Sequence, residues 1–136
     1  MKKKTFDRLI AAPPFLYSAI IFLIILFLTL APDVSPGKNV KLFPHADKVV
    51  HFLMFGAFSA TIVFDGWRKN HFINASLMIL AMFCSSFLGG LIEILQDAMG
   101  LGRTSDWWDF MADCAGAFVF ACFSVYICRI CQKKGL

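Results

Sequence analysis

Carboxylate side chains are concentrated in one short polar stretch of an otherwise apolar chain. The stretch runs from residue 93 to residue 113 and holds five of the nine acidic residues, namely Glu93, Asp97, Asp106, Asp109 and Asp113. Read as the end of one helix, a turn and the start of another, it places these acids three or four residues apart, on one face of each helix. Ionisable groups at membrane depth are costly and usually face a bundle interior or a water-filled cavity. The spacing therefore predicts a polar site at the mouth of a helical hairpin.

Further ionisable residues lie at the start of an earlier apolar run and in the turn of the hairpin. Asp47, Lys48 and His51 stand at the start of the run that ends near residue 64, and Arg103 lies between the two acid-bearing helices. Carboxylate oxygens suit Mg²⁺ or Ca²⁺, and imidazole suits a transition ion or acid–base chemistry. A guanidinium group suits bidentate capture of a phosphate or carboxylate. We predict that these groups meet in one outward-facing pocket, with the following ligand-binding residues: Lys48, His51, Glu93, Gln96, Arg103, Asp106, Asp109 and Asp113.

Two chemical roles and one structural role are open for this set. Glu93, Asp109 and Asp113 are the candidate ligands of a divalent cation, which would offset carboxylates left uncompensated near hydrocarbon. His51 and Glu93 are the candidates for the general acid or base of an enzyme. Alternatively, the lysine and the arginine pair with the acids, and the network only holds the helices in register.

The composition is that of an integral membrane protein. Hydrophobic residues make up 59% and charged residues 16% of the 136 residues, with a mean hydropathy of +0.71. So few charges cannot cover the surface of a soluble protein of this size. The apolar runs predict one domain over residues 1–136 with spans at about 15–31, 48–64, 72–95 and 107–131 and a loop over 65–71. The net charge of +4 does not indicate nucleic-acid binding, because the basic residues flank the apolar runs.

The distribution of basic residues predicts the orientation. Nine of the 13 lysines and arginines lie in the amino terminus, the second loop and the carboxyl tail, and four lie in the other two loops. By the positive-inside rule both termini are cytoplasmic and the polar pocket faces outward. The first apolar run is longer than the roughly 7–15 residues of a signal-peptide core, so we expect an uncleaved span. The predicted fold is an all-α integral membrane bundle of four transmembrane helices with short loops, N-in and C-in.

Small residues and cysteines in the apolar runs have structural interpretations. The last three predicted spans each carry two small residues four apart, which permits close helix contact; the pairs are Gly56 with Ala60, Ser86 with Gly90 and Ala112 with Gly116. Cys128 and Cys131 have no neighbouring histidine to complete a zinc set, so we interpret them as apolar filling.

The order and spacing of the polar residues resemble the VanZ family of small bacterial membrane proteins. That family opens one helix with Asp-Lys and His, closes another with Glu and Gln, and continues with Arg, Asp, Asn and Gly. The corresponding residues here are Asp47-Lys48-x-x-His51, Glu93-x-x-Gln96 and Arg103-x-x-Asp106-x-x-Asp109-x-x-x-Asp113-x-x-Gly116. The similarity covers residues 47–116, about half of the chain. One departure is Asp113, which stands where the family usually has Asn and adds a negative charge at the deepest point of the predicted pocket.

The resemblance implies a multi-pass protein of the bacterial cytoplasmic membrane, in a family named for a member linked to resistance to the glycopeptide teicoplanin. In a first hypothesis the pocket binds an anionic headgroup, a lipid-linked cell-wall precursor or the antibiotic, through Arg103 and Lys48 or through a carboxylate-bound cation. In a second, a metal held by Asp109 and Asp113 activates water against a lipid-linked phosphate, as in a hydrolase or transferase. In a third, the protein is a non-catalytic membrane scaffold or partner subunit. The expected partners are the lipid bilayer and one of these envelope ligands.

Overall fold

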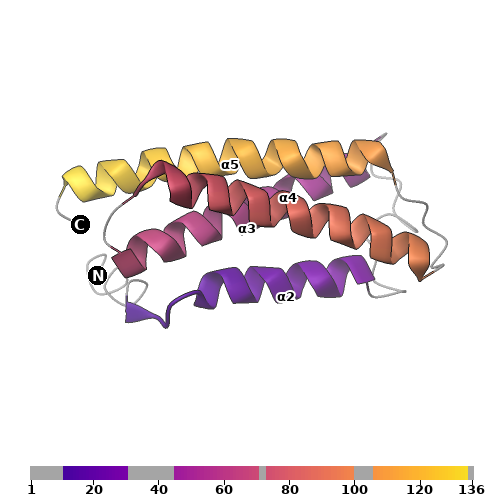
Figure 1. The fold of residues 1–136 in the computed structure, drawn as a ribbon, viewed down its shortest axis with the longest axis horizontal. Helices are drawn as coiled ribbons and strands as arrows, with labels where there is room; N and C mark the ends of the chain where they lie inside the picture. Colours follow the sequence, from indigo (N-terminus) through magenta and orange to yellow (C-terminus); the bar gives the residue numbers. More distant parts are fainter. Residues whose placement is uncertain (1–10, 31–44, 71–72, 100–105, 135–136) are drawn as a thin grey trace.

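The computed structural model describes residues 11–30, 45–70, 73–99 and 106–134. These residues form the helices α2 (Leu16–Leu30), α3 (Ala46–Asn70), α4 (Ala75–Ala98) and α5 (Trp107–Lys133), with no strand among the described residues. The helices lie lengthwise side by side, and consecutive helices run in opposite directions (Figure 1). α3 packs most extensively against α5. The predicted all-α fold is confirmed for this part of the chain.

Three of the helices have the length and composition of membrane spans. α3, α4 and α5 contain 25, 24 and 27 residues. At a rise of 1.5 Å per residue they are about 36–40 Å long, which exceeds the roughly 30 Å of a bilayer's hydrocarbon core. All three are also apolar enough to cross a membrane. α2 is apolar but has 15 residues, or about 22 Å, so at the predicted first span the structure has an apolar helix that is shorter than the hydrocarbon core.

Side-chain caps determine where α4 and α5 begin. Oδ1 of Asn74 accepts a hydrogen bond from the Leu77 N–H at 2.8 Å, and Oδ1 of Asp106 accepts one from the Trp108 N–H at 2.9 Å. Such caps satisfy backbone donors that have no partner in the first turn of a helix. α4 therefore begins after Asn74 and not at the predicted residue 72, whereas α5 begins at the predicted Trp107.

The loop predicted over residues 65–71 is wrong for residues 65–70, because α3 continues through Asn70. Asp65 and Arg68 lie on one face of the helix and are 0% and 6% exposed. The Ser18 N–H and hydroxyl of α2 donate to Asp65 Oδ2 at 2.9 and 2.7 Å, and Arg68 Nη2 donates to Asp65 Oδ1 at 2.5 Å. Burial against α2 thus makes this charged segment part of the bundle interior.

Apolar side chains fill the bundle and also cover its outside. One buried cluster surrounds Phe55 and Ile92, and a second surrounds Val63 and Ala121. On the outer surface Phe83 of α4 is 66% exposed, one of many large apolar side chains that face outward. A surface this apolar is unusual for a soluble monomer and typical of contact with lipid.

Glycines let α3 and α5 approach closely. A Cβ atom on Gly116 would overlap the backbone carbonyl of Phe52, and one on Gly56 would lie 2.6 Å from the Phe120 ring. The predicted small residues of the second and fourth spans therefore lie at the contact between these two helices. In α4 the buried small residues stand one position before the predicted pair, at Ser85 and Gly89 in place of Ser86 and Gly90.

Candidate functional site

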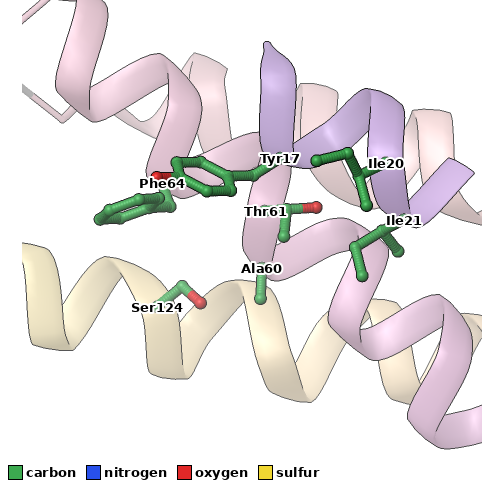
Figure 2. Close-up of a pocket in the computed structure, with 7 residues that line it drawn as sticks. All are labelled: Tyr17, Ile20, Ile21, Ala60, Thr61, Phe64 and Ser124. Atoms are coloured by element: carbon green, nitrogen blue, oxygen red, sulfur yellow. The ribbon is translucent and has the colours of Figure 1, made fainter. Parts of the chain in front are cut away.

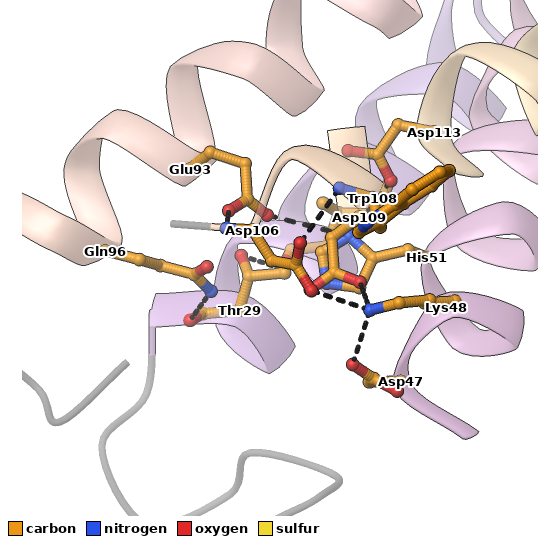
Figure 3. A network of polar contacts seen from close by, with 11 residues as sticks. Thr29, Asp47, Lys48, His51, Glu93, Gln96, Asp106, Trp108, Asp109 and Asp113 are labelled. Carbon is orange, nitrogen blue, oxygen red and sulfur yellow. Dashed lines mark hydrogen bonds and ion pairs between the residues drawn. The ribbon is translucent and has the colours of Figure 1, made fainter. Parts of the chain in front are cut away.

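Polar side chains gather at the end of the bundle where α3 and α5 begin and α4 ends (Figure 3). We call this set the polar cluster; its members are Asp47, Lys48, His51, Glu93, Asp106, Asp109 and Asp113. Of the predicted binding residues that the structure describes, it brings together all except Gln96. α3, α4 and the start of α5 each contribute side chains, so the cluster exists only in the assembled bundle.

Lys48 joins three carboxylates at the mouth of the polar cluster. Its Nζ lies 2.7 Å from Asp106 Oδ2 and 2.9 Å from Asp109 Oδ1. Asp47 Oδ2 is the third partner, at 3.2 Å. The lysine side chain is 23% exposed, so the mouth is open to solvent but partly covered. Asp106 precedes α5, and hydrogen bonds from Lys48 and from the Trp108 N–H lower the pKa of its carboxyl.

His51, Glu93 and Asp113 form a deeper layer below the mouth. His51 Nδ1 lies 2.9 Å from Asp113 Oδ1, and their side chains are 8% and 0% exposed. Glu93 Oε1 is 4.0 Å from the same nitrogen, and the Glu93 side chain is 9% exposed. Glu93 Oε2 accepts a hydrogen bond from the Asp106 N–H at 3.1 Å, which ties α4 to the start of α5.

Two buried carboxylate oxygens in this layer have no hydrogen-bond partner among the described residues. They are Glu93 Oε1 and Asp113 Oδ2. Asp113 Oδ2 lies against α4 at Gly89, where an added Cβ would come within 2.5 Å of it. Buried acceptors in native proteins are almost always paired, and an exception calls for a functional or structural explanation. The deeper layer therefore has acceptor capacity that the described side chains do not use.

Gln96 and Arg103 differ from the rest of the predicted set. Gln96 is buried, but its Nε2 donates to the Thr29 carbonyl of α2 at 2.9 Å, a bond drawn as a dashed line in Figure 3. It links α4 to α2 beside the polar cluster. Arg103 lies outside the described residues. Asp97, the remaining acid of the polar stretch, is exposed on α4.

The grouping of potential metal ligands differs from the predicted one. His51, Glu93 and Asp109 each offer one ligand atom, and these atoms all lie within 4.8 Å of one another. Asp113, the third predicted ligand, is instead hydrogen-bonded to His51. A second group, formed by Asp47, Asp106 and Asp109, surrounds the Lys48 ammonium group. In the deeper group, Asp109 alone contacts Lys48, at 2.9 Å, and Glu93 Oε1 has no hydrogen-bond partner among the described residues.

A second buried polar group lies at the opposite end of the bundle and was missed by the sequence analysis. It consists of Asp65, Arg68 and Ser18, with Arg68 also donating to the Ala12 and Pro13 carbonyls at 3.0 and 3.2 Å. The only signal in the sequence is the spacing of an acid and a base three residues apart, which places them on one helix face. Since Arg68 and Asp65 neutralise one another, this group differs from the acid-rich polar cluster.

An apolar groove of about 410 Å³ lies along α2, α3 and α5 (Figure 2). Its lining includes Tyr17, Ile21, Ala60 and Phe64. Tyr17 contacts Arg68, whose guanidinium carbon is 4.8 Å from the ring centroid, so the groove is displaced from the polar cluster. Its lining contains no charged side chain.

No family model, no curated protein and no solved structure matches this chain. The described part of the chain is all-helical, with three helices of membrane length. At one end of the bundle the chain carries a cluster of carboxylates with one histidine and one lysine, partly exposed at its mouth and buried in its deeper layer.

Proposed function

We propose that the chain is a VanZ-like multi-pass protein of the bacterial cytoplasmic membrane, with the polar cluster at the outer face. The charges at the two ends of the bundle support this orientation. At the end where α3 and α5 finish, the described basic residues are Arg68, Lys69, Arg129, Lys133 and Lys134, whereas Lys48 is the only described lysine or arginine at the polar cluster. By the positive-inside rule the basic end faces the cytoplasm.

Two further features support a membrane arrangement of four spans. Trp107 and Trp108, beside the polar cluster, are 69% and 67% exposed, and exposed tryptophans are favoured at the membrane–water interface. α2 lies along the bundle and exposes large apolar side chains such as Leu23 and Phe27, each 62% exposed. We therefore count α2 as a short fourth span, with both chain termini in the cytoplasm.

We further propose that the polar cluster binds the anionic headgroup of an envelope ligand, a lipid-linked cell-wall precursor or a glycopeptide, and so contributes to teicoplanin resistance. The observation that carries this proposal is the junction of Lys48 with three carboxylates at a partly exposed mouth, above a buried layer with unused acceptors. A phosphate arriving from outside meets the ammonium group first. Because Lys48 is already shared by three carboxylates, the geometry favours a bound cation as the main bridge to the headgroup over direct contact with the lysine alone.

The headgroup proposal is tested in the cell and with purified protein. Alanine at Glu93 or Asp109 should abolish the resistance phenotype while the amount of protein in the membrane stays normal. In nanodiscs, the native protein should retain a polyprenyl phosphate in native mass spectrometry and the Glu93→Ala variant should not. Alanine at the exposed Asp97 is the matched control and should change neither result. Loss of protein from the membrane with no other effect would favour the scaffold hypothesis.

A second candidate function is hydrolysis or transfer at a lipid-linked phosphate. The observation that favours it is the buried contact between His51 and Asp113, since an aspartate that accepts the Nδ1 proton orients the ring and leaves Nε2 as a base. His51 and Glu93 are the candidates for acid and base. Incubation of the protein with lipid phosphates should then release inorganic phosphate or a transferred product. Absence of product between pH 5 and 9 would leave binding as the function.

A further inference from the structure

His51, Glu93 and Asp109 come from three different helices and present ligand atoms to one small region. The three atoms lie within 4.8 Å of one another. A tetrahedral metal bound to nitrogen and oxygen ligands at about 2.0–2.2 Å holds neighbouring ligand atoms about 3.4 Å apart. The observed spacing therefore needs only small side-chain rotations to surround one ion. α3, α4 and α5 hold the three residues in this arrangement.

The buried oxygen of Glu93 is an independent observation that points to a ligand. Glu93 is 7% exposed, and its Oε1 has no hydrogen-bond partner among the described residues. The nearest cationic candidate, His51 Nδ1, is 4.0 Å away, which is too far for a hydrogen bond. A buried carboxylate oxygen without a partner is costly, and a cation in contact with it removes that cost.

The surrounding contacts leave ligand positions available on the other two residues. The contact of Asp113 Oδ1 with His51 Nδ1 at 2.9 Å orients the ring, and in the tautomer that carries the proton on Nδ1 the other ring nitrogen, Nε2, is an available ligand atom. Asp109 contacts Lys48 through Oδ1 at 2.9 Å, and its second oxygen remains as an acceptor. A carboxylate behind a histidine is the usual way in which proteins orient a metal-binding imidazole.

We propose that His51, Glu93 and Asp109 bind one divalent first-row transition ion such as Zn²⁺, and that Asp113 positions His51 for it. The imidazole favours such an ion over Mg²⁺ or Ca²⁺, which prefer all-oxygen sites. Three protein ligands leave at least one coordination position open, and an oxygen of an anionic headgroup fits there. The inference rests on the proposed function for the role of the ion, but ion binding itself requires no headgroup.

The test is metal binding by the full-length protein in detergent, stripped with a chelator and free of added lipid phosphate. Calorimetric titration should show one Zn²⁺ per chain, bound more tightly than Mg²⁺ or Ca²⁺. Co²⁺ should give a visible absorption band that reports nitrogen and oxygen ligation. The near-isosteric changes Glu93→Gln and Asp109→Asn should each weaken Zn²⁺ binding by more than about 100-fold, and Asp113→Asn, behind the ligand shell, by about 10–100-fold.

Asp97→Asn is the matched control, because Asp97 is an exposed acid near the end of the same helix as Glu93. It should bind Zn²⁺ like the native protein. Circular dichroism checks that each variant folds. If a third variant, His51→Gln, does not fold, the result is decided by Glu93→Gln and Asp109→Asn. The proposal is overturned if no saturable binding occurs, or if binding survives both Glu93→Gln and Asp109→Asn.

The outcomes separate this inference from the proposed function. Saturable Zn²⁺ binding by a protein that captures no polyprenyl phosphate would uphold the metal site and defeat the headgroup proposal. Capture of polyprenyl phosphate by chelator-treated protein that binds no Zn²⁺ would uphold the headgroup proposal and defeat the metal site.

Discussion

The buried pair of Asp65 and Arg68 predicts a large loss of stability when Asp65 is replaced by alanine. Asp65 is 0% exposed and accepts hydrogen bonds from Ser18 and Arg68. Asp65→Ala would leave the Arg68 guanidinium buried without its counter-charge and two Ser18 donors without an acceptor. Removing one partner of a buried ion pair costs about 3–5 kcal/mol. We expect the free energy of unfolding to fall by that amount.

Unfolding in mixed detergent micelles, followed by tryptophan fluorescence, measures the effect. Trp67 neighbours the ion pair in α3 and is 5% exposed, so its emission should shift when this end of the bundle opens. The exposed Asp97 supplies the control, and Asp97→Ala should stay within about 0.5 kcal/mol of the native protein. The paired change Asp65→Leu with Arg68→Met should recover much of the loss, because apolar residues of similar volume often replace a buried ion pair without cost. A loss below about 1 kcal/mol for Asp65→Ala would refute the burial argument.

Three further predictions follow from contacts elsewhere in the bundle, each measured by the same unfolding assay. Gly116→Ala should lower the free energy of unfolding by about 1–3 kcal/mol, since the added methyl group would overlap the α3 backbone; an unchanged value would contradict the close approach. Gln96→Leu should cost about 1–3 kcal/mol because the buried Thr29 carbonyl loses its donor at 2.9 Å, and full stability would show that α2 does not depend on this bond. Lys48→Met should reduce the loss in the free energy of unfolding that occurs as the pH is lowered into the acid range. Lys48 lowers the pKa of the Asp106 carboxyl, so Asp106 contributes stability above about pH 4 that is lost as the pH falls through its lower folded pKa. Identical profiles between pH 7 and pH 2 for the two proteins would contradict this.

Local spacing predicted much of the architecture. Runs of apolar residues located the helices, and steps of three and four placed the acids of α5 along one face. The helical character and the membrane-type composition of α3, α4 and α5 follow from these patterns alone. Asp106, predicted only as a binding residue, also caps α5.

What the sequence left undetermined depends on contacts between helices. Residues 65–70 read as a loop because they are charged, and their burial becomes evident only when α2 supplies Ser18 as a partner. Gln96 was grouped with Glu93, but a separation of three residues turns a side chain about 60° around a helix, enough for Gln96 to face α2. Asp113 was a candidate metal ligand, and the sequence did not indicate its contact with His51 at 2.9 Å. The rotation of one helix against another determined each of these outcomes.

α2 is attached to the rest of the bundle near each of its ends. Ser18 is bonded to Asp65 of α3 near its start, and the Thr29 carbonyl is bonded to Gln96 of α4 near its end. Sliding the helix along its axis by one turn, about 5.4 Å, would break both attachments at once. Exchanging its outward leucines and phenylalanines for other apolar residues would break neither. The position of α2 along the bundle is therefore determined by a few buried polar atoms, while its outward-facing apolar sequence is free to diverge.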